Sequence, residues 1–353
     1  MTSTQITLHI GAPKTGSSSV QGFLKSNHKL LQQYGLFYPT GEDHPALAVS
    51  PHHHLLVHAL TPMMQHWFDF PPSEAHRILM KILADAKSDP DTKQILLSHE
   101  MLYNNIERID ANVLKDLVGQ DPVRILVYAR RLDDWNESLY RQFIWGRLQP
   151  RSTVHHGQKI PMIQNTPHVR EMEARGVRFV AEAYSRMLPQ AEFIVRPYSA
   201  FRIGDGVIPD FLKALALPHQ EILANAAPQE RLNQSRPVAL TILLWHLQQT
   251  ELPTDVIFRV SRAGLKMARH TKPPMEIESR DYRFLPPEYA QQALKIYTED
   301  VNQFPSLAVD GCLTPWDNAV PAELTRDEQK RVFDWLAPKL QSDDLDAVAS
   351  VLA

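Results

Sequence analysis

Four short apolar stretches, each beside a helical pattern, organise the first two-thirds of the chain. Residues 6–10 alternate apolar and polar positions, whereas 94–98 and 123–129 are nearly continuous apolar runs. A fourth stretch covers residues 192–196. Alternation predicts a short strand, and the run over 123–129, with its β-branched members, predicts a strand buried on both faces.

Apolar positions at helical spacing predict helices between these strands and after them. In the strand-bearing part, the predicted helices cover residues 18–33, 52–60, 73–87, 110–118, 133–147, 168–187 and 206–215. After Arg236 the pattern is helical throughout, over 237–249, 254–267, 287–304, 322–340 and 343–352. Strands that alternate with helices imply an α/β fold with a mostly parallel sheet and helices on both faces.

The same pattern predicts the domain organisation. We expect one domain over residues 1–310, with a sheet core over 1–220 and a helical part over 221–310, followed by a helical C-terminal extension over 311–353. Ligands of such sheets bind beyond the carboxyl ends of the strands. Lys14, Glu100 and Arg130 each come soon after a predicted strand, so one crevice is expected to collect them.

Composition narrows the function classes. The formal net charge of −3 argues against broad binding to nucleic acid or to a membrane surface, which needs a basic excess. The single cysteine, Cys312, excludes an internal disulfide and fits a reducing compartment. We find neither a signal-peptide pattern nor an apolar run of membrane-spanning length, and we therefore expect a cytosolic protein.

The segment after the first strand has the layout of an anion cradle. Residues 11–20 read Gly-Ala-Pro-Lys-Thr-Gly-Ser-Ser-Ser-Val, a turn with two glycines that leads into a helix. The free N–H groups of such a turn and of the first helical turn point to one place, where the helix dipole favours a negative charge. An ordinary glycine turn before a helix is the plainer alternative.

The position of the lysine separates two kinds of cradle. In a nucleoside-triphosphate P-loop the lysine follows the second glycine. Here Gly11 and Gly16 have the P-loop spacing, but Ser17 follows Gly16 and the lysine comes earlier, at Lys14. A kinase or ATPase would therefore lack its lysine at the usual place.

A second motif follows the strand over 123–129. Arg130 ends that strand, and Ser138 lies eight positions later on the predicted helix. Arginine offers a planar fork of donors to phosphate oxygens, and a serine hydroxyl adds one more donor. An arginine at a strand end is most often a solvated charge, but two motifs in this order, both at strand-to-helix junctions, support each other.

With these two motifs the chain resembles the sulfotransferases that use 3′-phosphoadenosine 5′-phosphosulfate (PAPS). The similarity covers residues 6–20 and 123–142, continues more loosely over 184–217, and is nearest to bacterial enzymes that act on glycans or small hydroxyl compounds. It implies a P-loop-like fold, PAPS as the sulfuryl donor, 3′-phosphoadenosine 5′-phosphate (PAP) as a product, and no metal.

The resemblance also implies roles for individual residues. Lys14 would act at the bridging oxygen of the leaving group, and Arg130 with Ser138 would hold the 3′-phosphate. The remaining loop residues would surround the 5′-phosphate: Thr15, Gly16, Ser17, Ser18 and Ser19. The acceptor would be a hydroxyl group of a glycan or a small molecule.

The general base has two candidate places. One is the histidine run 52–54, with His53 and His54, since a histidine accepts a proton near neutral pH without much tuning. The other is His99-Glu100, directly after the strand over 94–98, where Glu100 is alternatively a buttress for Lys14 or Arg130. The histidine run alternatively consists of solvated imidazoles, or of zinc ligands, since His54 and His58 have a helical i,i+4 spacing.

One departure from the family concerns the 3′-phosphate site. Cytosolic eukaryotic enzymes close this site with an Arg-Lys-Gly loop near the C-terminus, which the chain lacks; Arg231, Arg280 and Arg283 are weak substitutes. A non-catalytic nucleotide-binding relative and a P-loop kinase are therefore kept as alternatives to the sulfotransferase.

Overall fold

The computed structural model describes residues 4–48, 53–146, 162–198, 206–227, 236–278, 281–309, 313 and 320–352. The chain divides into two compact units, and each is made of separate stretches. The first comprises residues 1–131, 173–233 and 296–313, and the second comprises 132–172, 234–295 and 314–353. The domain boundaries expected near residues 220 and 310 stay a prediction.

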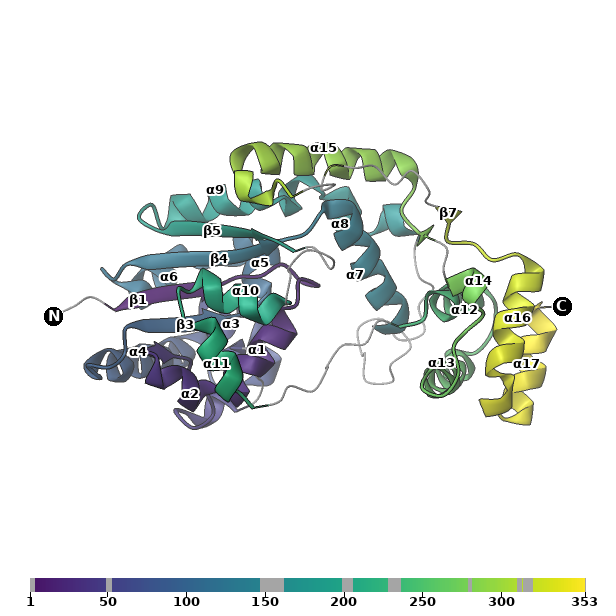
Figure 1. Cartoon of the computed structure of the whole chain (residues 1–353), viewed down its shortest axis with the longest axis horizontal. Helices are drawn as coiled ribbons and strands as arrows, with labels where there is room; N and C mark the ends of the chain where they lie inside the picture. Colours follow the sequence, from purple (N-terminus) through teal and green to yellow (C-terminus); the bar gives the residue numbers. More distant parts are fainter. Residues whose placement is uncertain are drawn as a thin grey trace. The chain divides into compact units, whose positions relative to one another are not determined.

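The first unit is built on a five-stranded parallel sheet in the order β2-β3-β1-β4-β5. Figure 1 labels β3, β1, β4 and β5 of this sheet. The strands are β1 Gln5–His9, β2 Leu36–Phe37, β3 Gln94–Ser98, β4 Val123–Ala129 and β5 Glu192–Pro197. In β1, Leu8 lies opposite Leu97 of β3 and Ile125 of β4. The prediction of an α/β fold with a mostly parallel sheet is confirmed, and β1 is its central strand.

Helices cover both faces of this sheet, as predicted. On one face, Ile6, Leu8 and Val127 pack in a core with α3, α4, α6 and α9. On the other face, Leu96 and Leu126 pack with α1, α2, α10 and α11. These helices are α1 Ser17–Ser26, α2 His28–Gln33, α3 His54–Leu60, α4 Pro72–Ser88, α6 Ala111–Val118, α9 Val177–Met187, α10 Val207–Ala214 and α11 His219–Asn225. Alternate side chains of a strand point to opposite faces, which explains the two cores.

Short elements complete the first unit. They are η1 Pro45–Leu47, η2 Pro62–Trp67, α5 Met101–Asn104, η3 Ile106–Arg108, η5 Glu173–Arg175 and η6 Pro305–Leu307. The end of α15, a helix over Pro287–Gln303, also belongs to this unit, where Asp300 accepts the N–H groups of Val177 and Arg178 at 3.1 and 2.9 Å. This carboxylate therefore caps α9.

Two helices predicted as continuous are interrupted. The segment predicted as one helix over 18–33 is α1 and α2, with Asn27 between them donating its side-chain amide to the carbonyl of Phe23 at 2.9 Å. The helix predicted over 168–187 is a short α8 (Pro167–Arg170), η5 and α9, because Gly176 leaves the helical conformation (φ −64°, ψ 147°) before α9 begins. Apolar periodicity continues across both breaks, so it did not indicate them.

The second unit is almost entirely helical. Its helices are α7 Leu132–Gly146, η4 Ile163–Asn165, α8 Pro167–Arg170, α12 Val238–Gln249, α13 Thr254–Ala268, α14 Met275–Glu278, the first part of α15, α16 Arg326–Leu336, η7 Ala337–Lys339 and α17 Ser342–Leu352. Two short strands, β6 Tyr282–Arg283 and β7 Val320–Pro321, pair with each other.

Two contacts show how the helices of this unit pack. A side chain on Gly264 of α13 would collide with Leu240 of α12, since its Cβ would lie 2.4 Å from Leu240 Cδ2. The glycine therefore permits the close approach of the two helices. Arg259 of α13 pairs with the buried Asp344 of α17 at 2.8 Å.

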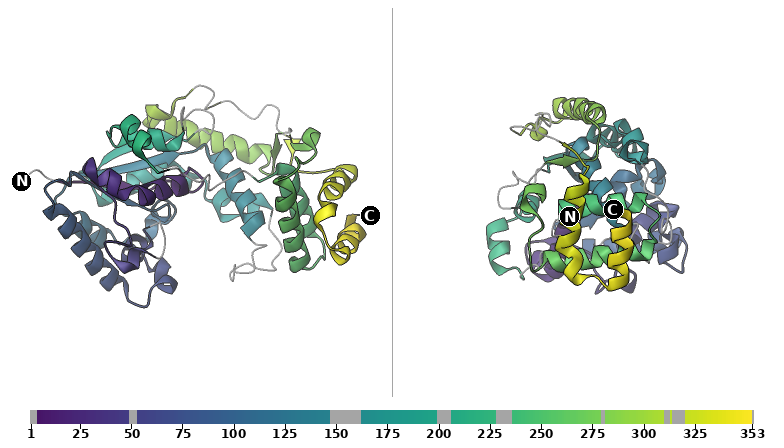
Figure 2. Two further views of the ribbon diagram at one scale, coloured as in Figure 1. Left: turned by 60° about the horizontal axis from the view of Figure 1, so that its bottom comes forward. Right: turned by 90° about the vertical axis from the view of Figure 1, so that its right-hand side faces the viewer.

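Helix lengths bear on the expectation of no membrane span. The longest described helices, α4 and α15, have 17 residues. Throughout the described part of the chain, every helix is too short or too polar to cross a bilayer. Figure 2 gives two further views, in which α16 and α17 can be followed side by side.

Candidate anion-binding loop at the end of the central strand

The predicted cradle lies at the carboxyl end of the central strand. Residues 10–16 connect β1 to α1, and Gly16 precedes the helix with a left-handed backbone (φ 81°, ψ 7°). Lys14 is also left-handed, with φ 66°, which is unusual for a residue other than glycine. The backbone carbonyl of Gly16 accepts the N–H groups of Ser19 and Val20. Alternation between right- and left-handed residues is a common way to turn successive N–H groups toward one anion.

Residues from both neighbouring strands converge on this loop. The hydroxyl of Ser17 donates to Glu100 Oε2 at 2.8 Å, and Glu100 directly precedes α5 after β3. Arg130, after β4, donates from Nη1 to the carbonyl of Lys14 at 3.2 Å. The Arg130 guanidinium also lies over the ring of Tyr198, 5.7 Å from its centroid. The structure thus brings Lys14, Ser17, Glu100 and Arg130 to one edge of the sheet, as the strand-end rule predicts.

The loop hydroxyls differ in their surroundings. Thr15 is buried, and its hydroxyl donates to the carbonyl of Ala12 at 2.5 Å, across the loop. Ser17 is also buried, whereas Ser18 and Ser19 are half-buried on the first turn of α1. Thr15 therefore supports the loop, and the backbone N–H groups and the first turn of α1 are the groups best placed to hold an anion.

The structure adds a residue that sequence reasoning missed, His9. This last residue of β1 is 1% exposed, and its Nδ1 lies 2.7 Å from the Ser98 hydroxyl. The Gln21 amide donates to Ser98 Oγ and to the Ser98 carbonyl at 3.0 and 3.3 Å. Burial lowers the pKa of His9 to about 3, so its imidazole is neutral at pH 7. The signal that the sequence offered was a histidine in the first strand, close before the loop.

His9 also reaches the loop itself. A Cβ added to Gly11 would lie 2.8 Å from His9 Nε2 and 3.5 Å from the Thr15 hydroxyl. His9 Nε2 and the Thr15 hydroxyl thus both lie close to Gly11. A side chain at position 11 would collide with the imidazole, so this position requires glycine.

His53, one candidate base, is held by the backbone at both ring nitrogens. Its Nε2 lies 2.9 Å from the carbonyl of Pro39, and its Nδ1 accepts the N–H of Ser98 at 3.0 Å. The side chain is buried and stacks on Tyr38. A histidine with this pairing is a neutral tautomer that ties α3 to β3, and nothing in its geometry favours proton transfer to a ligand.

His54 and His99 form a separate aromatic group. Their ring centroids lie 5.0 Å apart, and the ring of His54 also lies 4.7 Å from that of Trp67. His99 Nδ1 accepts the N–H of Met101 at 3.0 Å. His58, the other partner of the zinc alternative, bonds through Nε2 to the carbonyl of Phe70 at 2.8 Å and stacks on Phe68.

The remaining site residues lie in the second unit or outside the described residues. Ser138 is half-buried on α7 of the second unit, so its pairing with Arg130 of the first unit stays a prediction. Arg283 forms ion pairs with Asp134 and Asp281, both at 2.9 Å. His52, Arg231, Arg280, Cys312 and most of the segment over 150–167 lie outside the described residues.

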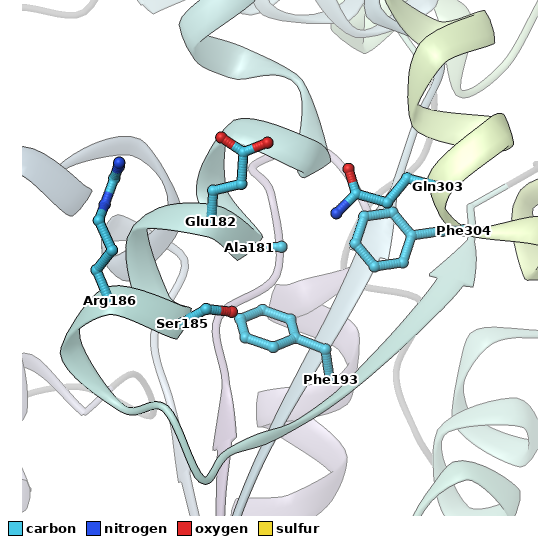
Figure 3. A pocket seen from close by; sticks show the side chains of 7 residues that line it. All are labelled: Ala181, Glu182, Ser185, Arg186, Phe193, Gln303 and Phe304. Atoms are coloured by element: carbon cyan, nitrogen blue, oxygen red, sulfur yellow. The ribbon is translucent and has the colours of Figure 1, made fainter.

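A pocket of about 370 Å³ lies elsewhere on the first unit. It is lined by Ala181, Glu182, Ser185, Arg186, Phe193, Gln303 and Phe304 (Figure 3). Phe193 is the second residue of β5, so this pocket is near the amino end of that strand, whereas the loop is at the carboxyl end of β1. None of the residues predicted for the site lines it.

Comparisons of the chain with protein-family models, with curated proteins and with solved structures give no match.

Proposed function

We propose that this protein is a sulfotransferase that moves the sulfuryl group of PAPS to an acceptor hydroxyl of a glycan or a small molecule. The observation that carries the proposal is the loop over 10–16, where left-handed Lys14 and Gly16 precede α1 and Arg130 contacts the loop from the next strand. A P-loop kinase would need its lysine after Gly16, where this chain has Ser17.

The residues present fit a phosphate-bearing donor. The backbone N–H groups of the loop and the first turn of α1, with Ser18 and Ser19, would hold the 5′-phosphate. Arg130 would take the 3′-phosphate, the role that the resemblance also gives to Ser138. PAPS supplies a sulfuryl group on a phosphate leaving group. The Lys14 ammonium would stabilise the charge that builds on the bridging oxygen as the sulfur–oxygen bond breaks.

The geometry favours Glu100 as the general base over the histidine run. The acceptor oxygen would form a bond to sulfur, PAP would leave, and the acceptor proton would pass to the Glu100 carboxylate. Glu100 is half-buried beside the loop, bonded to Ser17. Both ring nitrogens of His53 have backbone partners, which argues against that residue. His54, with His99 next to it, is the second candidate.

The proposed donor is tested by ligand-induced stabilisation and by transfer. PAP at 100 times its Kd should raise the free energy of unfolding by about 2.7 kcal/mol, because a ligand that binds only the folded state stabilises it. Adenosine 5′-phosphate, which lacks the 3′-phosphate, should stabilise the protein less. Transfer of labelled sulfate from PAPS to a panel of glycans and phenols then identifies the acceptor. Stabilisation by ATP with magnesium but not by PAP would refute the proposal in favour of a kinase.

A further inference from the structure

His9 is a buried polar residue that the proposed mechanism does not use. It lies on the face of β1 that packs on α1 and α10, with its ring 5.0 Å from that of Phe211 and 6.3 Å from that of Tyr128. A fully buried histidine needs partners for both ring nitrogens, since an unmet donor or acceptor there costs free energy. The hydrogen bonds around Ser98 reveal which nitrogen carries the proton.

Ser98 determines the tautomer of His9. The Gln21 amide donates to the hydroxyl and to the carbonyl of Ser98, so the hydroxyl already accepts one hydrogen bond. The hydroxyl has one proton to donate, and His9 Nδ1, at 2.7 Å, is the acceptor that the described residues offer to it. A neutral imidazole that accepts at Nδ1 must carry its proton at Nε2.

The Nε2–H group lies beside the loop. A Cβ added to Gly11 would be 2.8 Å from Nε2 and 3.5 Å from the Thr15 hydroxyl, so both groups border the same glycine. Among the residues that the structure describes, Nε2–H has no hydrogen-bond acceptor. A donor in a side chain that is 1% exposed, next to the loop that leads into the N-terminus of α1, is suited to a ligand that brings its own acceptor.

We infer that His9 Nε2–H donates directly to the anionic group bound in the loop over 10–16, and that Ser98 and Gln21 are the residues that orient it. This inference rests on the proposed function, in which that group is the 5′-phosphate end of the donor. An uncharged donor suits this place, because a second cation beside Lys14 would need to be desolvated.

Two substitutions test the two ring nitrogens of His9 one at a time. His9→Asn keeps an acceptor near the position of Nδ1 for Ser98 and removes the group at Nε2. His9→Gln keeps an amide N–H near the position of Nε2 and removes the partner of Ser98. We expect His9→Asn to lower the affinity for PAP about ten- to a hundredfold, as expected for a lost hydrogen bond to a charged group. His9→Gln should retain most of the affinity but melt at a lower temperature without ligand.

The measurement is calorimetric titration of each full-length variant with PAP and with inorganic pyrophosphate. The reverse ranking, with affinity kept in His9→Asn and lost in His9→Gln, would overturn the inference and leave His9 a structural residue. If the wild type binds pyrophosphate but not PAP, the proposed function fails, and the pyrophosphate affinities of the variants still test His9. If the wild type binds neither, both ideas are wrong.

A spectrum of the wild type tests the same inference without mutation. In ¹⁵N-histidine spectra, the His9 signals should be those of a neutral ring protonated at Nε2, and PAP should shift the Nε2–H resonance. The signal is assigned from its absence in His9→Asn. A resonance protonated at Nδ1, or one that PAP leaves unmoved, would overturn the inference.

Discussion

Lys14 has the least common backbone conformation among the site residues. A left-handed backbone costs a residue with a side chain about 1–2 kcal/mol relative to the usual regions. The Arg130 bond to its carbonyl, together with the turn at Gly16, holds Lys14 in this conformation. Strain of this kind is kept where the surrounding structure enforces it, and it often marks a functional position.

Replacing Lys14 by alanine should remove the ammonium group and keep the conformation of the loop. Arg130 bonds to the backbone carbonyl of residue 14, which alanine retains. We expect turnover to fall at least about a hundredfold, near 2.7 kcal/mol of barrier, with a smaller loss of PAP affinity. Steady-state sulfate transfer and PAP titration measure the two effects. A variant that loses only affinity would make Lys14 a binding residue and not a catalytic one.

Glu100 can be tested with an isosteric change. Glu100→Gln still accepts the Ser17 hydroxyl through its amide oxygen but cannot take a proton. Loss of a general base typically lowers the rate by a factor of about 10² to 10⁴. PAP affinity should hold or improve, because a negative charge beside the anion site is removed. The matched control is His54→Gln, and the assignment of the base moves to His54 if that variant is the slower one.

At the scale of elements, the site depends on the order of the strands. Because β1 is central, β3 and β4 lie on either side of it, and the residues that follow all three strands meet at one edge. Glu100 and Arg130 reach the loop from opposite sides for this reason. The start of α9 also depends on a residue that is distant in sequence. Asp300 of α15 accepts its first N–H groups and so caps the helix.

At the scale of the whole molecule, two buried groups, Asp300 and His9, should change the free energy of unfolding in opposite directions as the pH changes. Burial raises the pKa of Asp300 to about 6, against the lowering effect of the N–H groups of Arg178 and Val177. Its contribution to stability is complete below pH 3.8 and is lost as the pH rises through 6. Burial lowers the pKa of His9 to about 3, so its contribution is lost as the pH falls below 6.5. The two slopes have opposite signs between pH 4 and 6.

A variant of each residue should reveal its own contribution to the pH dependence of the unfolding free energy. Relative to Asp300→Asn, the wild type should lose about 2 kcal/mol of unfolding free energy as the pH rises from 4 to 6. Relative to His9→Asn, it should gain stability over the same range, by about 1.4 kcal/mol for each pH unit at most. Urea unfolding at several pH values measures both differences. A difference that stays constant with pH for either variant would contradict the burial of that group.

The sequence by itself determined the elements and the loop. The strands over 94–98 and 123–129 have the predicted bounds, and the loop lies between β1 and α1, because apolar period and glycine spacing are properties of contiguous residues. The two broken helices, at Asn27 and Gly176, were mispredicted because apolar periodicity does not register a local cap or turn.

The tertiary structure decided how the candidate residues are used. Ser17 and Glu100 are 83 positions apart, and His9 and Ser98 are 89 apart, so their bonds depend on β3 lying next to β1. His53 looked like a base in sequence, but Pro39 and Ser98 occupy its two nitrogens. His9 looked like an ordinary strand residue, but the network that sets its tautomer comes from two other elements. Local patterns specify secondary structure, whereas the pairing of distant polar groups follows from strand order and packing.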